Sequence, residues 1–157
     1  MKPLDTPTDA TPTKKQGVLL LVEDERDNVM VAQLQLRKRY DVLVAMSDEE
    51  ACRHLRESAS KIDAVLMDIQ LRGSSLDGLE LARAMRKDGE LDALPDFARD
   101  LPGACANIPI LFVTAFANNE GVDFESVTAC SVVGKPINFS ELNLKLTQLY
   151  LSRISSR

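Results

Sequence analysis

The chain is 157 residues long, is 45% hydrophobic and 27% charged, and carries a net charge of −5 at pH 7. This length suits one domain with a full core, and the acidic balance argues against broad nucleic-acid binding, which needs a basic surface. No apolar stretch reaches the ~18 residues of a membrane span, and residues 1–16 lack the apolar core of a signal peptide. We therefore expect a cytoplasmic protein that binds neither membranes nor nucleic acids.

Short apolar runs alternate with stretches of helical spacing along most of the chain. Residues 1–16 are rich in proline and threonine and have almost nothing to bury, so we expect a disordered tail there and one domain over residues 17–157. The expected strands are Val18–Val22, Tyr40–Ala45, Ala64–Met67, Ile110–Val113 and Ser131–Val133. The expected helices are Asp27–Arg39, Ser47–Ser58, Asp77–Lys87, a weakly patterned Val122–Thr128, and Ser140–Arg153.

This alternation predicts an α/β domain with a doubly wound, five-stranded parallel sheet that is buried on both faces by helices. Of the two common doubly wound orders, five strands favour the flavodoxin-like order 2-1-3-4-5. The first and third strands are then neighbours. Ligands of such sheets bind outside the carboxyl ends of the strands, so the residues that follow each strand should meet at one rim.

Acidic and polar residues follow four of the expected strands. Glu23 and Asp24 follow the first strand, Asp68 the third, Thr114 the fourth and Lys135 the fifth. Three crowded carboxylates repel each other unless their pKa values rise or a cation neutralises them, and Mg²⁺ prefers such oxygen ligands. A lysine suits a phosphoryl oxygen. A carboxylate nucleophile, a Mg²⁺ site, a lysine and a hydroxyl together predict an aspartyl-phosphate centre.

The ordered set resembles the receiver (response-regulator) domain family of two-component signalling, over about residues 17–153. Five short matches carry the resemblance: Leu-Val-Glu-Asp at 21–24, Met-Asp-Ile at 67–69, Asp-Gly-Leu-Glu-Leu at 77–81, Val-Thr-Ala at 113–115 and Lys-Pro at 135–136. The resemblance implies a signalling switch rather than an enzyme. It would accept a phosphoryl group from a histidine kinase or a phosphotransfer protein and then contact a downstream output protein, as a monomer or a weak dimer.

The resemblance also implies a role for each site residue. Asp68 would be the phospho-acceptor, with Thr114 as the switch hydroxyl and Lys135 as the phosphoryl-binding cation. The metal ligands would be carboxylates together with the main-chain carbonyl of Gln70: Glu23, Asp24, Asp68 and Gln70. The Lys135–Pro136 bond is expected to be cis.

Three departures from the family pattern stand out. The loop from Asp68 to Asp77 is about two residues longer than usual. Val132 occupies a position where the family often has an aromatic switch residue, and Phe116 is the nearest aromatic candidate. Residues 88–107 form an insertion before the fourth expected strand, at the sheet edge far from Asp68. Its apolar residues either pack on the domain or face a partner.

Other functions fit the residues less well. A flavodoxin-like cofactor binder would need a phosphate loop after the first strand, where this chain has the acidic Glu23-Asp24-Glu25. A phosphohydrolase with an aspartyl nucleophile usually carries a second acid two residues on, and here that position is Gln70. An inert receiver-like scaffold conflicts with the complete residue set. Within the family, we expect a stand-alone, chemotaxis-type regulator, with a receiver of a hybrid histidine kinase or a larger regulator as the alternative.

Overall fold

The computed structural model describes residues 14–115, 124, 127 and 130–155. Five parallel strands form one sheet in the order β2-β1-β3-β4-β5, as expected. The strands are β1 (Val18–Val22), β2 (Asp41–Ala45), β3 (Ala64–Asp68), β4 (Ile110–Thr114) and β5 (Cys130–Gly134). The expected helix at 122–128 and the candidate Phe116 fall largely or wholly outside the described residues.

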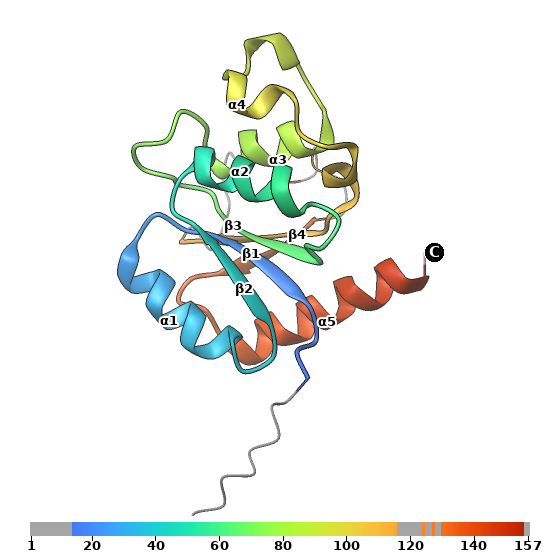
Figure 1. Cartoon of the computed structure of the whole chain (residues 1–157). Coiled ribbons are helices and arrows are strands. Elements are labelled where there is room, and N and C mark those ends of the chain that lie inside the picture. The colour runs from blue at the N-terminus through green and yellow to red at the C-terminus, as the bar shows by residue number, and fades with distance from the viewer. Residues whose placement is uncertain (1–13, 116–123, 125–126, 128–129, 156–157) are drawn as a thin grey trace, which may run out of the picture.

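Helices cover both faces of the sheet (Figure 1). One face carries α1 (Arg26–Leu36) and α5 (Phe139–Ser155), and the other carries α2 (Asp48–Ser58) and α3 (Gly78–Arg86). The doubly wound fold predicted from the sequence is thereby confirmed. Within the described residues, no helix has both the length and the apolar character needed to cross a membrane.

Alternation along the strands divides the core into two apolar layers. Leu19 and Leu21 of β1 belong to the layer under α1 and α5, whereas Leu20 and Val22 belong to the layer under α2 and α3. Successive side chains of a strand point to opposite faces, which is why a continuous apolar run supplies both layers. The same alternation continues past each strand and sets the face on which the next residues lie.

Capping residues set where two helices begin. Ser47 accepts a hydrogen bond from the Glu50 amide at 3.2 Å and so starts α2. Asp77 and Glu80 form a complete reciprocal capping box at the start of α3. α3 ends at Arg86, one residue before the expected end at Lys87, because Lys87 adopts a left-handed conformation with φ of 54° and closes the helix.

The segment between α3 and β4, residues 88–107, contains three short helical turns. They are η1 (Leu91–Ala93), α4 (Asp96–Arg99) and η2 (Gly103–Asn107). Ala98, Leu101 and Cys105 are each at most 2% exposed and join the core layer of α2 and α3. Of the two alternatives left by the sequence, packing on the domain is therefore the observed one.

Candidate functional site at the carboxyl edge of the sheet

The site begins where β1 and β3, which are neighbours in the sheet, reach their carboxyl ends. Leu21 pairs with Leu66 and Val22 with Met67, so Glu23 and Asp68 follow at the same level of the sheet. Side chains two residues apart on a strand point to the same face. Leu21 and Leu66 belong to the layer under α1 and α5, so Glu23 and Asp68 lie on that face as well. Strand pairing and alternation thus bring the two carboxylates together.

Three carboxylates form a compact acidic cluster at this edge. One carboxylate oxygen from each of Glu23, Asp24 and Asp68 lies within 4.8 Å of the other two. Glu23 and Asp68 are only 5% and 7% exposed, whereas Asp24 is half-buried at the rim. Carboxylates that lie this close together and are this well buried repel each other and lose hydration, so they require positive charge nearby.

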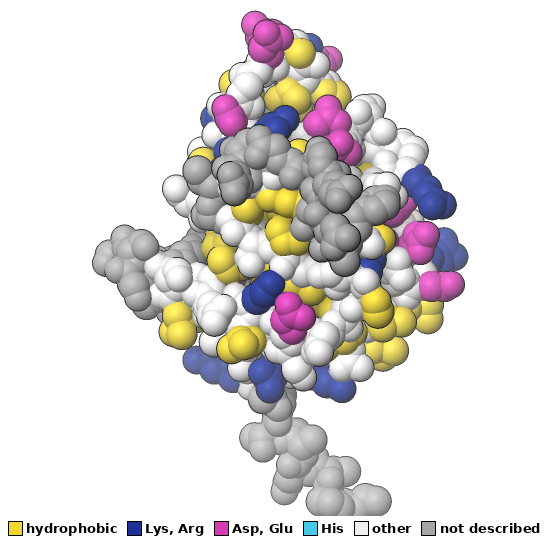
Figure 2. All heavy atoms as spheres, turned by 180° about the vertical axis from the view of Figure 1, so that it is seen from behind, with side chains coloured by type: hydrophobic (Ala, Val, Ile, Leu, Met, Phe, Trp, Pro, Cys, Tyr) yellow, Lys and Arg dark blue, Asp and Glu magenta, His cyan; other side chains and the backbone are white. Residues whose placement is uncertain are grey.

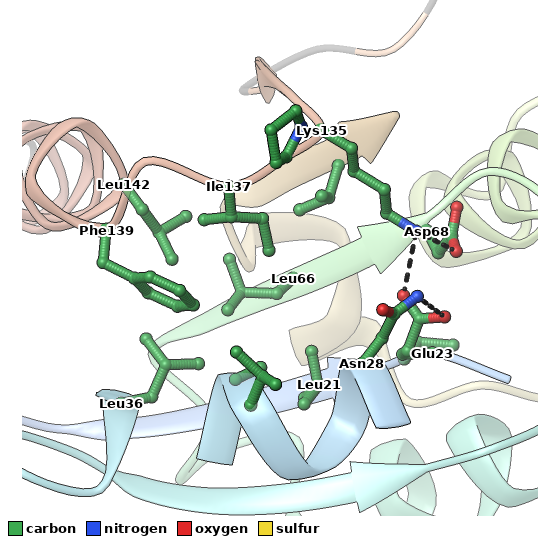
Figure 3. A pocket seen from close by; sticks show the side chains of 15 residues that line it. Leu21, Glu23, Asn28, Leu36, Leu66, Asp68, Lys135, Ile137, Phe139 and Leu142 are labelled. Carbon is green, nitrogen blue, oxygen red and sulfur yellow. Dashed lines mark hydrogen bonds and ion pairs between the residues drawn. The ribbon is translucent and has the colours of Figure 1, made fainter. Parts of the chain in front are cut away.

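Lys135 supplies one positive charge from the end of β5. Its Nζ donates to Asp68 Oδ2 at 2.9 Å and to Glu23 Oε2 at 3.2 Å, as the dashed lines in Figure 3 show. The Lys135 amide donates to the Thr114 carbonyl at 2.7 Å, and the following bond to Pro136 is cis, as expected. Three carboxylates against one ammonium leave two negative charges, which is the charge that one divalent cation neutralises.

The pKa values of Glu23 and Lys135 reflect the excess of negative charge in the cluster. Burial, followed by the charge of Asp68, raises the pKa of Glu23 above its usual value, although Lys135 acts in the opposite direction. For Lys135, burial lowers the pKa, but its hydrogen bond to Asp68 and the charges of Asp68 and Glu23 outweigh burial and raise it. Lys135 is therefore charged at neutral pH, and Glu23 takes up protons more readily than an exposed glutamate.

The loop after β3 contacts the cluster through its main chain. The Gln70 amide donates to Asp68 Oδ1 at 3.3 Å, and the Arg72 amide donates to Asp24 Oδ2 at 2.9 Å. A cleft of about 220 Å³ opens here, and its walls include Asp24, Asp68, Gln70, Thr114 and Lys135. The cleft thus brings together five of the six predicted site residues, and the sixth, Glu23, belongs to the same acidic cluster as Asp24 and Asp68.

Two further residues support the site, and the sequence reasoning did not assign them. Asn28 on α1 donates from Nδ2 to Glu23 Oε1 at 3.4 Å and to Glu25 Oε2 at 3.0 Å. Asp48, the first residue of α2, is 3% exposed and accepts from the amides of Ser75 and Leu76, both at 2.9 Å. The spacing from Glu23 to Asn28 could have suggested the first contact, but only the tertiary fold brings Asp48 to the loop after β3.

Val132 lies on the face of the sheet that carries α2 and α3. It pairs with Phe112 in the sheet register and packs against the core of that face. The ring of Phe124 lies 5.1 Å from that of Phe112, centroid to centroid. An aromatic pair that the sequence reasoning overlooked is thus adjacent to the position where the family often has an aromatic switch residue.

Residues 19–147 match the family described as the response regulator receiver domain, and the chain belongs to this family. A curated relative, a probable histidine kinase 1 of Oryza sativa subsp. indica, is 25% identical over 94% of this chain. The chain spans 17% of the length of that relative. Receiver domains are regulatory domains of two-component signalling, in which they interact with histidine kinases or phosphotransfer proteins.

Solved structures agree with this assignment. The receiver domain of the sensor histidine kinase PA1611 from Pseudomonas aeruginosa, with a magnesium ion in its active-site cleft, is 27% identical with a TM-score of 0.64, and covers 85% of this chain and 97% of its own. The receiver domain of the hybrid histidine kinase CckA is also 27% identical, with a TM-score of 0.62, and covers 85% and 99%. A receiver protein of Clostridium thermocellum, at 16% identity and a TM-score of 0.71 over 90% and 99%, shares the fold.

Proposed function

We propose that this chain is a phosphorylation-dependent switch in which Asp68 accepts a phosphoryl group from a histidine kinase or a phosphotransfer protein. The observation that supports this most directly is the convergence of the Lys135 ammonium on Asp68 beside the acid pair Glu23 and Asp24. A carboxylate oxygen of Asp68 attacks phosphorus while the bond from phosphorus to the donor histidine nitrogen breaks. The nitrogen keeps the bonding electron pair, and an acyl phosphate forms on Asp68.

The remaining site residues stabilise charge during this transfer. Lys135 is close enough to shift from the Asp68 carboxylate to a phosphoryl oxygen, and the Thr114 hydroxyl, at the end of β4, is the candidate switch group. Glu23, Asp24, Asp68 and the Gln70 carbonyl would hold Mg²⁺, which matches the two uncompensated charges of the cluster. Bound Mg²⁺ would offset the negative charge of the entering phosphoryl oxygens.

The proposed switch works through protein contacts rather than by turning over a substrate. We propose a single receiver domain over residues 17–157, with an insertion at about 88–107, that acts in the cytoplasm as a monomer or weak dimer. Its partners would be a cognate phosphodonor and a downstream output protein. Family membership and the acidic cleft beside Asp68 support this reading over that of a flavodoxin-like or phosphohydrolase enzyme.

The phospho-acceptor assignment is tested with acetyl phosphate and Mg²⁺, followed by intact-protein mass measurement. We expect one phosphoryl group on the wild type and none on Asp68→Asn. We also expect none on the wild type when EDTA is present during the reaction. Asp96→Asn is the matched control, because this exposed aspartate forms an ion pair with Arg99 of its own helix, away from the acidic cluster. A phosphorylated Asp68→Asn protein, or labelling that resists EDTA, would refute the assignment.

A second candidate function is that of a receiver segment within a longer histidine kinase. The similarity to a curated histidine kinase, of which the chain spans 17%, and to receivers of two sensor kinases favours this reading. An antibody against residues 88–107 would detect the natural protein in extracts of its source. A band near 17.3 kDa supports the stand-alone regulator, whereas a much larger band supports the kinase segment.

A further inference from the structure

An apolar cavity of about 260 Å³ lies on the α1 and α5 face of the sheet, next to the acidic cluster. Side chains from α1, α5, β1, β3 and the segment after Lys135 point into it (Figure 3). Leu36, Leu66 and Leu142, which line it, are at most 2% exposed, so the cavity reaches into the protein core. Val31, which is 55% exposed, marks an opening beside α1.

The polar groups of this cavity gather at one end and bind one another. Lys135 bridges Glu23 and Asp68, and Asn28 donates to Glu23. A charged ligand would have to break these ion pairs in a partly buried place, which is costly. The remaining walls offer only apolar surface, so the cavity selects against charge.

We propose that this cavity binds a small uncharged apolar molecule of one or two rings. An apolar cavity of about 150 Å³ already binds benzene, so this larger one has room for benzene or a molecule of the size of indole. A helix, at roughly 10 Å across, is far too wide for such a volume. The argument for this site uses only the shape and lining of the cavity and does not rest on the proposed phosphorylation of Asp68.

The position of the cavity links its occupant to the acidic cluster. Lys135 lines the cavity and ends in the ammonium that contacts Asp68 and Glu23. Ile137 and Phe139, just after the cis bond, form another part of the wall. A molecule between α1 and α5 therefore contacts the segment that carries Lys135 from inside the core, and binding should change the environment of the Lys135 amide.

Methyl-group NMR of the full chain, titrated with benzene, tests this proposal. We expect saturable shift changes at the methyl groups of Leu21, Leu66 and Leu142, which line the cavity. Ala32→Leu places three extra carbons in the cavity and should weaken benzene binding at least tenfold. Ala93→Leu adds the same atoms to an exposed position of η1 and should leave binding unchanged.

Surface binding gives a different result in the same titration. Met30 and Leu34 are exposed on α1, so shift changes at these two residues without changes at Leu21 and Leu66 would overturn the proposal. The absence of saturable shifts in the wild type, or equal affinity in Ala32→Leu, would overturn it as well. If Ala32→Leu does not fold, Val113→Ile, which also fills the cavity, replaces it in the comparison.

Discussion

At the scale of single residues, Gly78 fixes how closely α3 approaches the site. A Cβ atom at this position would lie 2.0 Å from the Asp68 carbonyl oxygen, and the Gly78 amide donates to the Ile69 carbonyl at 2.8 Å. Gly78→Ala must therefore push α3 away from the end of β3. We expect a loss of about 1–3 kcal/mol in the free energy of unfolding and slower phosphorylation of Asp68.

Urea unfolding and acetyl phosphate labelling measure the two effects of Gly78→Ala. Gly103→Ala is the matched control, because a Cβ atom there meets nothing within 4 Å. Equal stability and equal labelling rates in the two variants would show that the contact between α3 and β3 does not matter for the site.

Glu23 makes the effect of Mg²⁺ depend on pH. Burial and the charge of Asp68 raise its pKa, so the folded protein binds a proton at Glu23 more tightly than the unfolded chain. Its contribution to stability is therefore present at low pH and lost as pH rises through the folded pKa. A proton on Glu23 also competes with a cation. We expect Mg²⁺ to raise the melting temperature more at about pH 7 than at about pH 5.

Thermal unfolding with and without Mg²⁺, at both pH values, measures this competition. Glu23→Gln removes the titrating group and should make the Mg²⁺ effect smaller and less dependent on pH. An equal rise in melting temperature at both pH values in the wild type would contradict the role assigned to Glu23.

At the scale of structural elements, Asp48 ties the start of α2 to the loop after β3. It accepts from the Ser75 and Leu76 amides, and its own amide donates to the Ser74 hydroxyl at 3.1 Å. The same loop carries Gln70 and Arg72, whose amides contact the acidic cluster. Asp48→Ala leaves two amides without their acceptor, and we expect a loss of about 1–3 kcal/mol in stability together with weaker Mg²⁺ binding.

Mg²⁺ titration and urea unfolding of Asp48→Ala measure these effects. Glu49→Ala is the matched control, since this neighbour in the first turn of α2 is exposed. Wild-type Mg²⁺ affinity in a destabilised Asp48→Ala protein would show that Asp48 holds the loop without positioning the metal ligands.

At the scale of the whole molecule, the segment between α3 and β4 packs Ala98, Leu101 and Cys105 into the core on the side away from the site. Arg86, the last residue of α3, donates to the Cys105 and Ile108 carbonyls, and Arg56 near the end of α2 donates to the Phe97 carbonyl. These helix ends lie at the edge of the sheet opposite to Asp68. Figure 2 shows acidic side chains at the outer end of the molecule, where Figure 1 places this segment.

Leu101→Ala should therefore affect stability without affecting chemistry. Leu101 is 2% exposed, and such a truncation costs about 2–5 kcal/mol. Leu34→Ala, at a side chain that is 71% exposed, is the control and should change stability by less than about 0.5 kcal/mol. Phosphorylation of Asp68 in folded Leu101→Ala protein should match the wild type. A slower reaction would mean that the segment communicates with the site.

Local signals in the sequence were sufficient to predict the strands and which polar residues meet at their carboxyl ends. Each apolar run became a strand within a residue or two, because a strand buried on both faces needs continuous apolar side chains. Helix ends were less accurate, since Lys87 adopts a left-handed conformation that a lysine rarely takes. The convergence of Glu23, Asp68 and Lys135 followed from strand order and from polar residues at strand ends.

What the sequence by itself determined about this protein is the parallel sheet, its order and the acidic cluster with its lysine. These depend on periodicity and on the short motifs that follow each strand. Only the tertiary structure decided how Asp48 holds the loop after β3, that Leu101 enters the core, and that a cavity remains between α1 and α5. Each of these depends on contacts between residues far apart in the chain, and such contacts leave no periodic pattern in the sequence.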